Sequence, residues 1–242
     1  MSDLAQQPVV VLVHGAFAES ASWNAVIQEL TAEGVSATAI ANPLRSLRGD
    51  AAYLRDVVAS LGRPVILAGH SYGGQVITEA AAGNPAVRGL VYVSAFAPET
   101  GESALELSGK FPGSTLGDAV VARPLSGGGN ELSIDTAKFA QQFAADADPA
   151  GAALMAATQR PVTELALTEG LSGGQAAWRT LPSWFVWGSA DRNIPAEALR
   201  FMAERAGGRT TTEVPGAGHA LPVSQPEAVA GTILQAVSAV RA

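Results

Sequence analysis

The chain contains no cysteine. Its 242 residues therefore form no disulfide, offer no thiolate nucleophile and bind no metal through thiolates. Lysine is almost as scarce, with only Lys110 and Lys138, and the formal net charge is -7 without a dense basic cluster. This charge balance argues against nucleic acid or an anionic membrane surface as a partner. No metal-ligand spacing and no dinucleotide fingerprint is present, so we expect neither a metal nor a cofactor.

Long apolar runs are also missing. The run from Val9 to Val13 is only long enough for a strand, and residues 1–7 lack the basic segment of a signal peptide. We therefore expect no membrane span and, by default, a cytoplasmic location. With 48% hydrophobic and 15% charged residues, the composition is typical of a globular protein, and the length suits one large α/β domain.

Short apolar segments alternate with helix-compatible segments along most of the chain. This alternation predicts a doubly wound, mainly parallel sheet with right-handed crossovers. We expect six strands, at residues 9–13, 35–40, 64–68, 89–94, 183–187 and 210–214. Asp50 is expected to cap the helix that ends at Gly62, and Ser224 and Glu227 to form a capping box at the last helix.

The alternation stops between about Glu99 and Leu181. In this region glycine-rich loops, such as Gly127-Gly128-Gly129-Asn130, separate short helix candidates at 136–145 and 149–158. Because so long a gap between strands is rarely structureless, the sequence predicts an inserted helical cap. The expected division is the first part of the core at 1–98, the cap at 99–181 and the rest of the core at 182–242.

A glycine-rich turn, Gly69-His70-Ser71-Tyr72-Gly73-Gly74, joins the third expected strand to the next helix. It contains the G-x-S-x-G pattern of a nucleophile elbow, in which a strained serine projects above the sheet. The pattern alone also occurs at purely structural turns. A catalytic interpretation therefore needs a base, an acid and donors for an oxyanion.

Only three histidines can supply the base. His14 ends the first strand, and His70 directly precedes Ser71 on the side away from the expected attack. His219 lies in a loop after the last strand, from which its ring can reach Ser71. His219 is therefore the predicted base.

The acid should also follow a strand, because it must orient the imidazole at the carboxyl edge of the sheet. Asp191 meets this condition, and Glu99 is the fallback. For the oxyanion hole we expect the N–H groups of Tyr72 and of Ala16, the latter preferred over Phe17. Apolar side chains at helical spacing are usually core. Even so, we name as candidates for an acyl or alcohol pocket Phe17, Phe96, Met155 and Trp178.

These motifs resemble the α/β-hydrolase superfamily over nearly the whole chain. The resemblance rests on four features: His14-Gly15-Ala16-Phe17, the elbow, Asp191 and Gly216-Ala217-Gly218-His219. They occur in the chain order of that superfamily. The sequence is most similar to the group of plant methylesterases, hydroxynitrile lyases and bacterial pyrethroid-type esterases. The resemblance implies Ser71 as nucleophile, His219 as base and Asp191 as acid, with Ala16 and Tyr72 as oxyanion donors.

Departures from the pattern narrow the chemistry. Lyases of the group carry threonine at the position of Gly15 and lysine at that of Ala220, so cyanohydrin cleavage is disfavoured. Dehalogenases and epoxide hydrolases of the superfamily use aspartate at the elbow, which Ser71 argues against. The cap offers no specific match to the family.

The expected activity is that of a serine carboxylesterase acting on a small apolar ester through an acyl-enzyme, without a cofactor. Lactone or amide hydrolysis and perhydrolysis are alternatives on the same triad, and a ligand-binding protein on a hydrolase fold is another. The expected partner is a small-molecule ester, and a homodimer stays open. The sequence does not specify the natural substrate.

Overall fold

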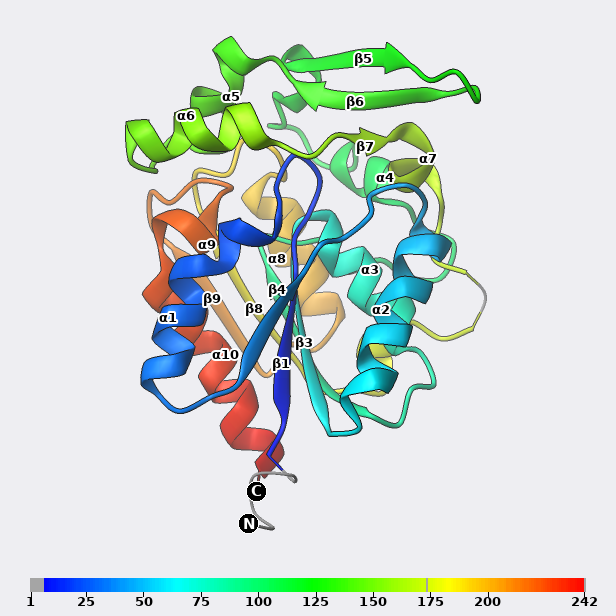
Figure 1. Ribbon diagram of the computed structural model, residues 1–242, viewed down its shortest axis with the longest axis vertical. Helices are drawn as coiled ribbons and strands as arrows, with labels where there is room; N and C mark the ends of the chain where they lie inside the picture. The colour runs from blue at the N-terminus through cyan, green and yellow to red at the C-terminus, as the bar shows by residue number, and fades with distance from the viewer. Residues whose placement is uncertain (1–6, 173, 242) are drawn as a thin grey trace.

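Six parallel strands form the centre of the computed structural model, which describes residues 7–172 and 174–241 (Figure 1). Their order across the sheet is β2-β1-β3-β4-β8-β9. The strands are β1 (Val9–Val13), β2 (Ala37–Ile40), β3 (Val65–His70), β4 (Val87–Val93), β8 (Ser183–Gly188) and β9 (Thr210–Val214). The predicted fold class and strand count are confirmed.

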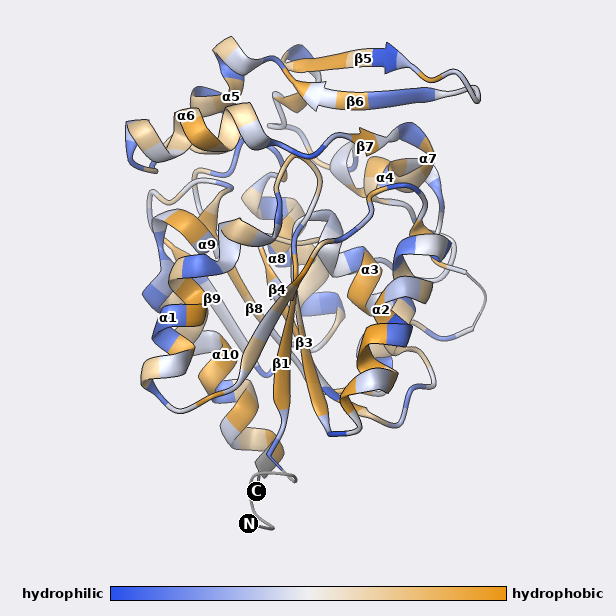
Figure 2. Cartoon of the chain, viewed as in Figure 1, coloured by the Kyte–Doolittle hydropathy of each residue, from blue (hydrophilic) through white to orange (hydrophobic). Residues whose placement is uncertain are grey.

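Helices cover both faces of the sheet. One face packs against α1 (Asn24–Ala32), α9 (Leu221–Ser224) and α10 (Pro226–Arg241), and the other against α2 (Leu47–Leu61), α3 (Tyr72–Ala81) and α8 (Ala196–Arg205). Each central strand is buried on both sides because its apolar residues face both layers; Val10 and Leu12 face one layer and Val11 and Val13 the other. Figure 2 shows this apolar interior in orange.

Two predicted helix caps are wrong. Ser46 caps α2, because its hydroxyl accepts a hydrogen bond from the Gly49 N–H at 3.1 Å. Asp50 lies inside the first turns of α2 and is fully buried. Ser224 is the last residue of α9, and its hydroxyl donates to the Ala220 carbonyl. Both predictions identified a polar residue close to a helix start, but α2 and α10 begin at other residues than the predicted caps require.

The segment between β4 and β8 was predicted to be helical, but it contains both helices and strands. Its helices are α4 (Ala104–Ser108), α5 (Thr136–Phe143), α6 (Pro149–Thr158) and α7 (Glu164–Thr168). Its antiparallel sheet comprises β5 (Val120–Pro124), β6 (Asn130–Ile134) and β7 (Val162–Thr163). Short 3₁₀ helices complete the described fold, at Ser20–Trp23, Leu116–Asp118 and Ala177–Arg179.

The missed strands have a local explanation. The glycine run that predicted a loop is the turn between β5 and β6, where Gly128 and Gly129 adopt φ of 91° and 75°. Glycine reaches such angles without steric cost. We call residues 99–181 the insert and keep these boundaries as a prediction. Figure 1 shows its strands and the helices α5 and α6 above the carboxyl ends of the core strands, where parallel sheets bind ligands.

Candidate active site

Ser71 lies at the junction of β3 and α3, where its backbone adopts φ 54° and ψ -123°. Such a conformation is costly for a residue other than glycine and persists only when its surroundings impose it. The Ser71 carbonyl accepts hydrogen bonds from the N–H groups of Gly74 (3.0 Å) and Phe96 (3.2 Å), and the Ser71 N–H donates to Val93 (3.2 Å). The turn is therefore fixed by α3 and by β4 with the segment that follows it.

Close packing explains two of the glycines around the elbow. A Cβ atom on Gly73 would lie 2.3 Å from the Val13 carbonyl oxygen, and one on Gly15 would lie 2.6 Å from the Ser71 Cβ atom. Real Cβ atoms do not approach so closely. The loop after β1 therefore rests directly against the elbow.

His219 and Asp191 form a buried pair next to this turn. The distance from His219 Nδ1 to Asp191 Oδ2 is 2.7 Å, and both side chains are almost completely shielded from solvent. The other carboxylate oxygen accepts the N–H groups of Asn193 (2.8 Å) and Ile194 (2.9 Å). Since a carboxylate only accepts, the proton of the neutral ring is on Nδ1. His219 Nε2 is then an acceptor, and it has no hydrogen-bond partner among the described residues.

His70 connects the elbow to the loop that carries His219. Its Nε2–H donates to the His219 carbonyl at 2.9 Å, and the two rings are 4.8 Å apart. Burial, and secondarily the nearby His219, lowers the pKa of His70 well below its usual value, so the ring is neutral. From the sequence, His70 was excluded as the base and was given no other role. Its position beside Ser71 was a signal for this link, but the acceptor lies 149 residues away.

His14 fixes the loop after β1 in a similar way. Its Nδ1–H donates to the Gly15 carbonyl (2.9 Å), and its Nε2 accepts the Asn42 N–H (3.0 Å). The Asn42 side chain returns a hydrogen bond to the His14 carbonyl (3.0 Å). Burial is the largest cause that lowers the pKa of His14 to about 4. Sequence reasoning missed Asn42 because the contact depends on the pairing of β1 with β2.

The two expected oxyanion donors lie on adjoining segments. Tyr72 is the first residue of α3, where backbone N–H groups have no acceptor within the helix. A Cβ atom built on Gly15 lies 3.1 Å from the Tyr72 nitrogen, so the loop with Ala16 is close by. The Phe17 N–H donates to the Arg160 carbonyl at 3.1 Å and is thus already engaged. This geometry favours Ala16 over Phe17.

Comparison with known proteins decides the family. A model of the alpha/beta hydrolase family matches residues 10–232. The chain belongs to this family. It is 47% identical over 60 residues to a carbendazim hydrolyzing esterase of Nocardioides sp., covering 23% of this chain and 25% of that protein.

Solved structures agree with the fold of this α/β hydrolase. Polyneuridine aldehyde esterase superposes with a TM-score of 0.81 at 21% identity, covering 95% of this chain and 99% of that one. A pyrethroid hydrolase from Sphingobium faniae gives 0.75 at 21% identity, covering 96% and 98%. The predicted resemblance to this esterase-like group is confirmed.

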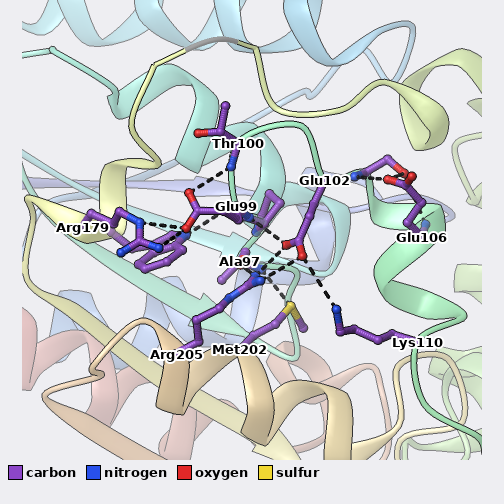
Figure 3. A network of polar contacts seen from close by, with 12 residues as sticks. Ala97, Glu99, Thr100, Glu102, Glu106, Lys110, Arg179, Met202 and Arg205 are labelled. Atoms are coloured by element: carbon purple, nitrogen blue, oxygen red, sulfur yellow. Dashed lines mark hydrogen bonds and ion pairs between the residues drawn. The ribbon is translucent and has the colours of Figure 1, made fainter.

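Glu99, the fallback acid of this α/β hydrolase, is engaged elsewhere. Its carboxylate accepts hydrogen bonds from the Arg179 guanidinium, including Nε at 2.7 Å, and from the Thr100 N–H at 3.0 Å (Figure 3). The hydrogen bonds from Arg179 lower the pKa of Glu99. The carboxylate that pairs with His219 is that of Asp191.

Two apolar cavities lie on either side of Phe17 in the hydrolase, and the smaller of them reaches the elbow. The smaller, about 60 Å³, is lined by Ser71, Tyr72, Phe17 and Phe96 together with insert residues such as Leu105. The larger, about 350 Å³, is lined by Phe17 and by residues of α6, including Met155. Phe17 borders both.

Trp178, the fourth predicted pocket residue, lines neither of these two cavities. Its indole N–H donates to the Pro98 carbonyl at 2.8 Å, and the Arg179 and Arg205 guanidinium groups lie 4.7 and 5.6 Å from its ring. Trp178 is placed to hold the insert against the core.

Residues 7–172 and 174–241 were searched for a metal-binding cluster and for a helix that could span a membrane. No three ligating side chains there are grouped as a metal site would require. None of the helices in these ranges has the length and apolar character needed to cross a bilayer.

Proposed function

We propose that the protein is a serine carboxylesterase with Ser71 as nucleophile, His219 as base and Asp191 as acid. The observation that carries this proposal is the buried His219–Asp191 hydrogen bond of 2.7 Å beside a strained Ser71 at the start of α3. The His219 Nε2 atom is left as an acceptor for the serine proton. The partial identity to a curated esterase supports the reaction class.

In this proposal, each step of the ester hydrolysis is assigned to a named residue. Ser71 Oγ attacks the ester carbonyl while His219 Nε2 takes its proton, and Asp191 stabilises the imidazolium. The N–H groups of Ala16 and Tyr72 donate to the oxyanion, where each such donor contributes about 3 to 4 kcal/mol of transition-state stabilisation. His219 then protonates the leaving alcohol. Water, deprotonated by His219, attacks the acyl-enzyme, and Ser71 regains its proton as the acid leaves.

The cavities indicate the kind of ester. A cavity needs a volume of about 10 to 15 Å³ to hold one water molecule, which is roughly the space of one heavy atom. The cavity of about 60 Å³ at Ser71 therefore holds roughly four to six heavy atoms. That volume fits a short acyl group. The cavity of about 350 Å³ is in the range of small-molecule sites and is mostly apolar. The proposed substrate therefore combines a short acyl group with a larger apolar alcohol.

Hydrolysis of p-nitrophenyl esters from acetate to decanoate tests the proposal. We expect the highest kcat/KM for the short acyl chains. Ser71→Ala should lower kcat by at least about a thousandfold, because the nucleophile is lost. Ser60→Ala, on the exposed face of α2, is the control and should leave kcat unchanged. Equal turnover by wild type and Ser71→Ala on all esters would contradict the mechanism.

A further inference from the structure

Asp50 is a buried carboxylate for which the triad has no use. It lies within α2 and is fully shielded from solvent. Its Oδ2 atom accepts the Tyr72 hydroxyl at 2.9 Å, and its Oδ1 atom accepts the Arg45 backbone N–H at 3.1 Å. Burial raises the pKa of Asp50, so keeping a carboxyl group here is costly. Its position next to the elbow suggests what offsets that cost.

Tyr72 links Asp50 to the oxyanion hole. Tyr72 directly follows Ser71, and its N–H is one of the two proposed oxyanion donors. Its ring is fully buried, and its hydroxyl donates to Asp50. Asp50 therefore holds the far end of the residue whose backbone must point at the developing charge.

Arg45 carries the same connection into the insert. Its Nη2 donates to the Pro161 carbonyl at 2.6 Å, and its Nη1 pairs with Glu131 at 2.8 Å. Thr163 reinforces the contact, because its hydroxyl donates to the Arg45 carbonyl at 2.6 Å. The Thr163 N–H also donates to the Leu44 carbonyl at 3.1 Å. The segment before α2 is thus bonded to the insert through both backbone and side chain.

The same strip of the insert holds the other donor loop. The Arg160 carbonyl accepts the N–H of Phe17, the neighbour of Ala16, at 3.1 Å. Residues 160–163 therefore touch the Ala16 loop directly and reach Tyr72 through Arg45 and Asp50. Both proposed oxyanion donors are thus connected by hydrogen bonds to one short segment of the insert.

We propose that Arg45 and Asp50 are positioning residues that couple the insert to the oxyanion hole, so that the hole has its working geometry only when residues 160–163 are docked. This inference rests on the proposed function. Misplacing a catalytic group by about 1 Å can cost a hundredfold in rate. The insert thus acts on the transition state as well as enclosing the substrate.

Kinetics of Arg45→Met and Asp50→Asn test the proposal, with Arg48→Met as the control. The Arg48 side chain is exposed on α2, near both test positions, and makes no hydrogen bond or ion pair with the other described residues. We expect kcat to fall by about 10- to 100-fold in the two test variants, as for partial loss of an oxyanion donor, with KM changed less than about twofold. Affinity for a boronic acid, which forms a tetrahedral adduct, should fall in proportion, and affinity for the carboxylate product should not.

A loss shared equally by the boronic acid and the product, or an unchanged kcat, would overturn the proposal. Tyr72→Phe, which keeps the ring and removes only the hydroxyl, should reproduce the kcat loss and serves if Asp50→Asn does not fold.

Amide hydrogen exchange gives a readout that does not depend on turnover. Arg45→Met should raise exchange in residues 14–18 and in 70–74 together, and Arg48→Met in neither. Unchanged exchange in both segments would contradict the coupling. If the exchange rises but the wild type hydrolyses no ester, the coupling stands and the proposed function fails.

Discussion

Each of the three histidines is placed in a different hydrogen-bonding environment. His219 Nδ1 bonds to a carboxylate, whereas His14 and His70 each donate to a backbone carbonyl. Burial lowers the pKa of both His14 and His70 and outweighs the hydrogen bonds to the carbonyls, which by themselves would raise it. His14 and His70 thus fix the loops on either side of Ser71, and His219 is the histidine that we propose as the base.

The neutral state of His14 predicts a specific loss of stability in acid. Its pKa is about 4 in the folded protein against an ordinary 6.5, so the unfolded chain binds the proton more readily. The stabilisation is complete above pH 6.5 and is lost as the pH falls toward 4, by about 3 kcal/mol in all. His14→Gln keeps hydrogen-bonding groups but does not titrate. In urea unfolding at about pH 7 and about pH 4.5, the wild type should lose about 2 kcal/mol more than the variant. Equal losses would show that His14 is not the group responsible.

The contact between His219 and Asp191 was predictable from the sequence. The scarcity of histidine left few candidates, and Asp191 follows a strand, so the pair that the structure shows at 2.7 Å followed from chain order. The partners Asn42 and Asp50 were not predictable. Asn42 meets His14 only through strand pairing, and Asp50 was interpreted as a cap because acidic residues commonly occupy that position.

At the scale of elements, the loop after β1 separates the two cavities by one side chain. Phe17 borders both and is held at φ 61° by the Arg160 contact. Phe17→Ala should join the cavities and move the acyl-chain optimum to longer esters. The kcat/KM for octanoate should rise by about tenfold relative to that for acetate, which corresponds to the burial of one or two methylene groups. Leu154→Ala, at an exposed position of the larger cavity, is the control. An unchanged chain-length profile would show that Phe17 does not limit the acyl side.

Element prediction succeeded where the pattern was local. Among the strands of the core, β1 and β3 begin with runs of branched apolar residues, and α5 and α6 lie where helical spacing placed them. It failed for β5 and β6, because neither segment alternates apolar with polar residues along one buried face: β5 is mostly exposed, and β6 mixes polar and apolar residues without a regular period. The boundaries of the insert and its role as a lid over the site stay predictions.

At the scale of the molecule, the first end of the insert is bonded both to the core and to the far end of the insert. Arg205 of α8 makes two hydrogen bonds to Glu102, at 2.9 and 2.7 Å, and one to the Ala97 carbonyl at 2.8 Å. Arg179, near the far end of the insert, pairs with Glu99. Figure 3 shows these contacts converging from the segment after β4, the insert and α8. The network thus ties together the two points where the insert leaves and rejoins the sheet.

Arg205→Met tests this anchoring. The side chains of Arg205 and Glu102 are only 19% and 25% exposed, so losing two charged hydrogen bonds should lower the free energy of unfolding by about 2 to 3 kcal/mol. Arg200→Met is the matched control on the same helix. Its pair with Glu213 is 47% and 34% exposed and should contribute less than about 1 kcal/mol. Urea denaturation measures both, and similar losses in the two variants would contradict the special role of Arg205.

The central claim is that Ser71 is an activated nucleophile, and covalent labelling tests it most directly. The protein is treated with a fluorophosphonate probe, and the modified peptide is identified by mass spectrometry. The account predicts one label per chain, on Ser71, absent in Ser71→Ala and at least about a hundredfold slower in His219→Ala, because the base is lost. Labelling at another serine, or none in the folded wild type, would contradict the proposed mechanism.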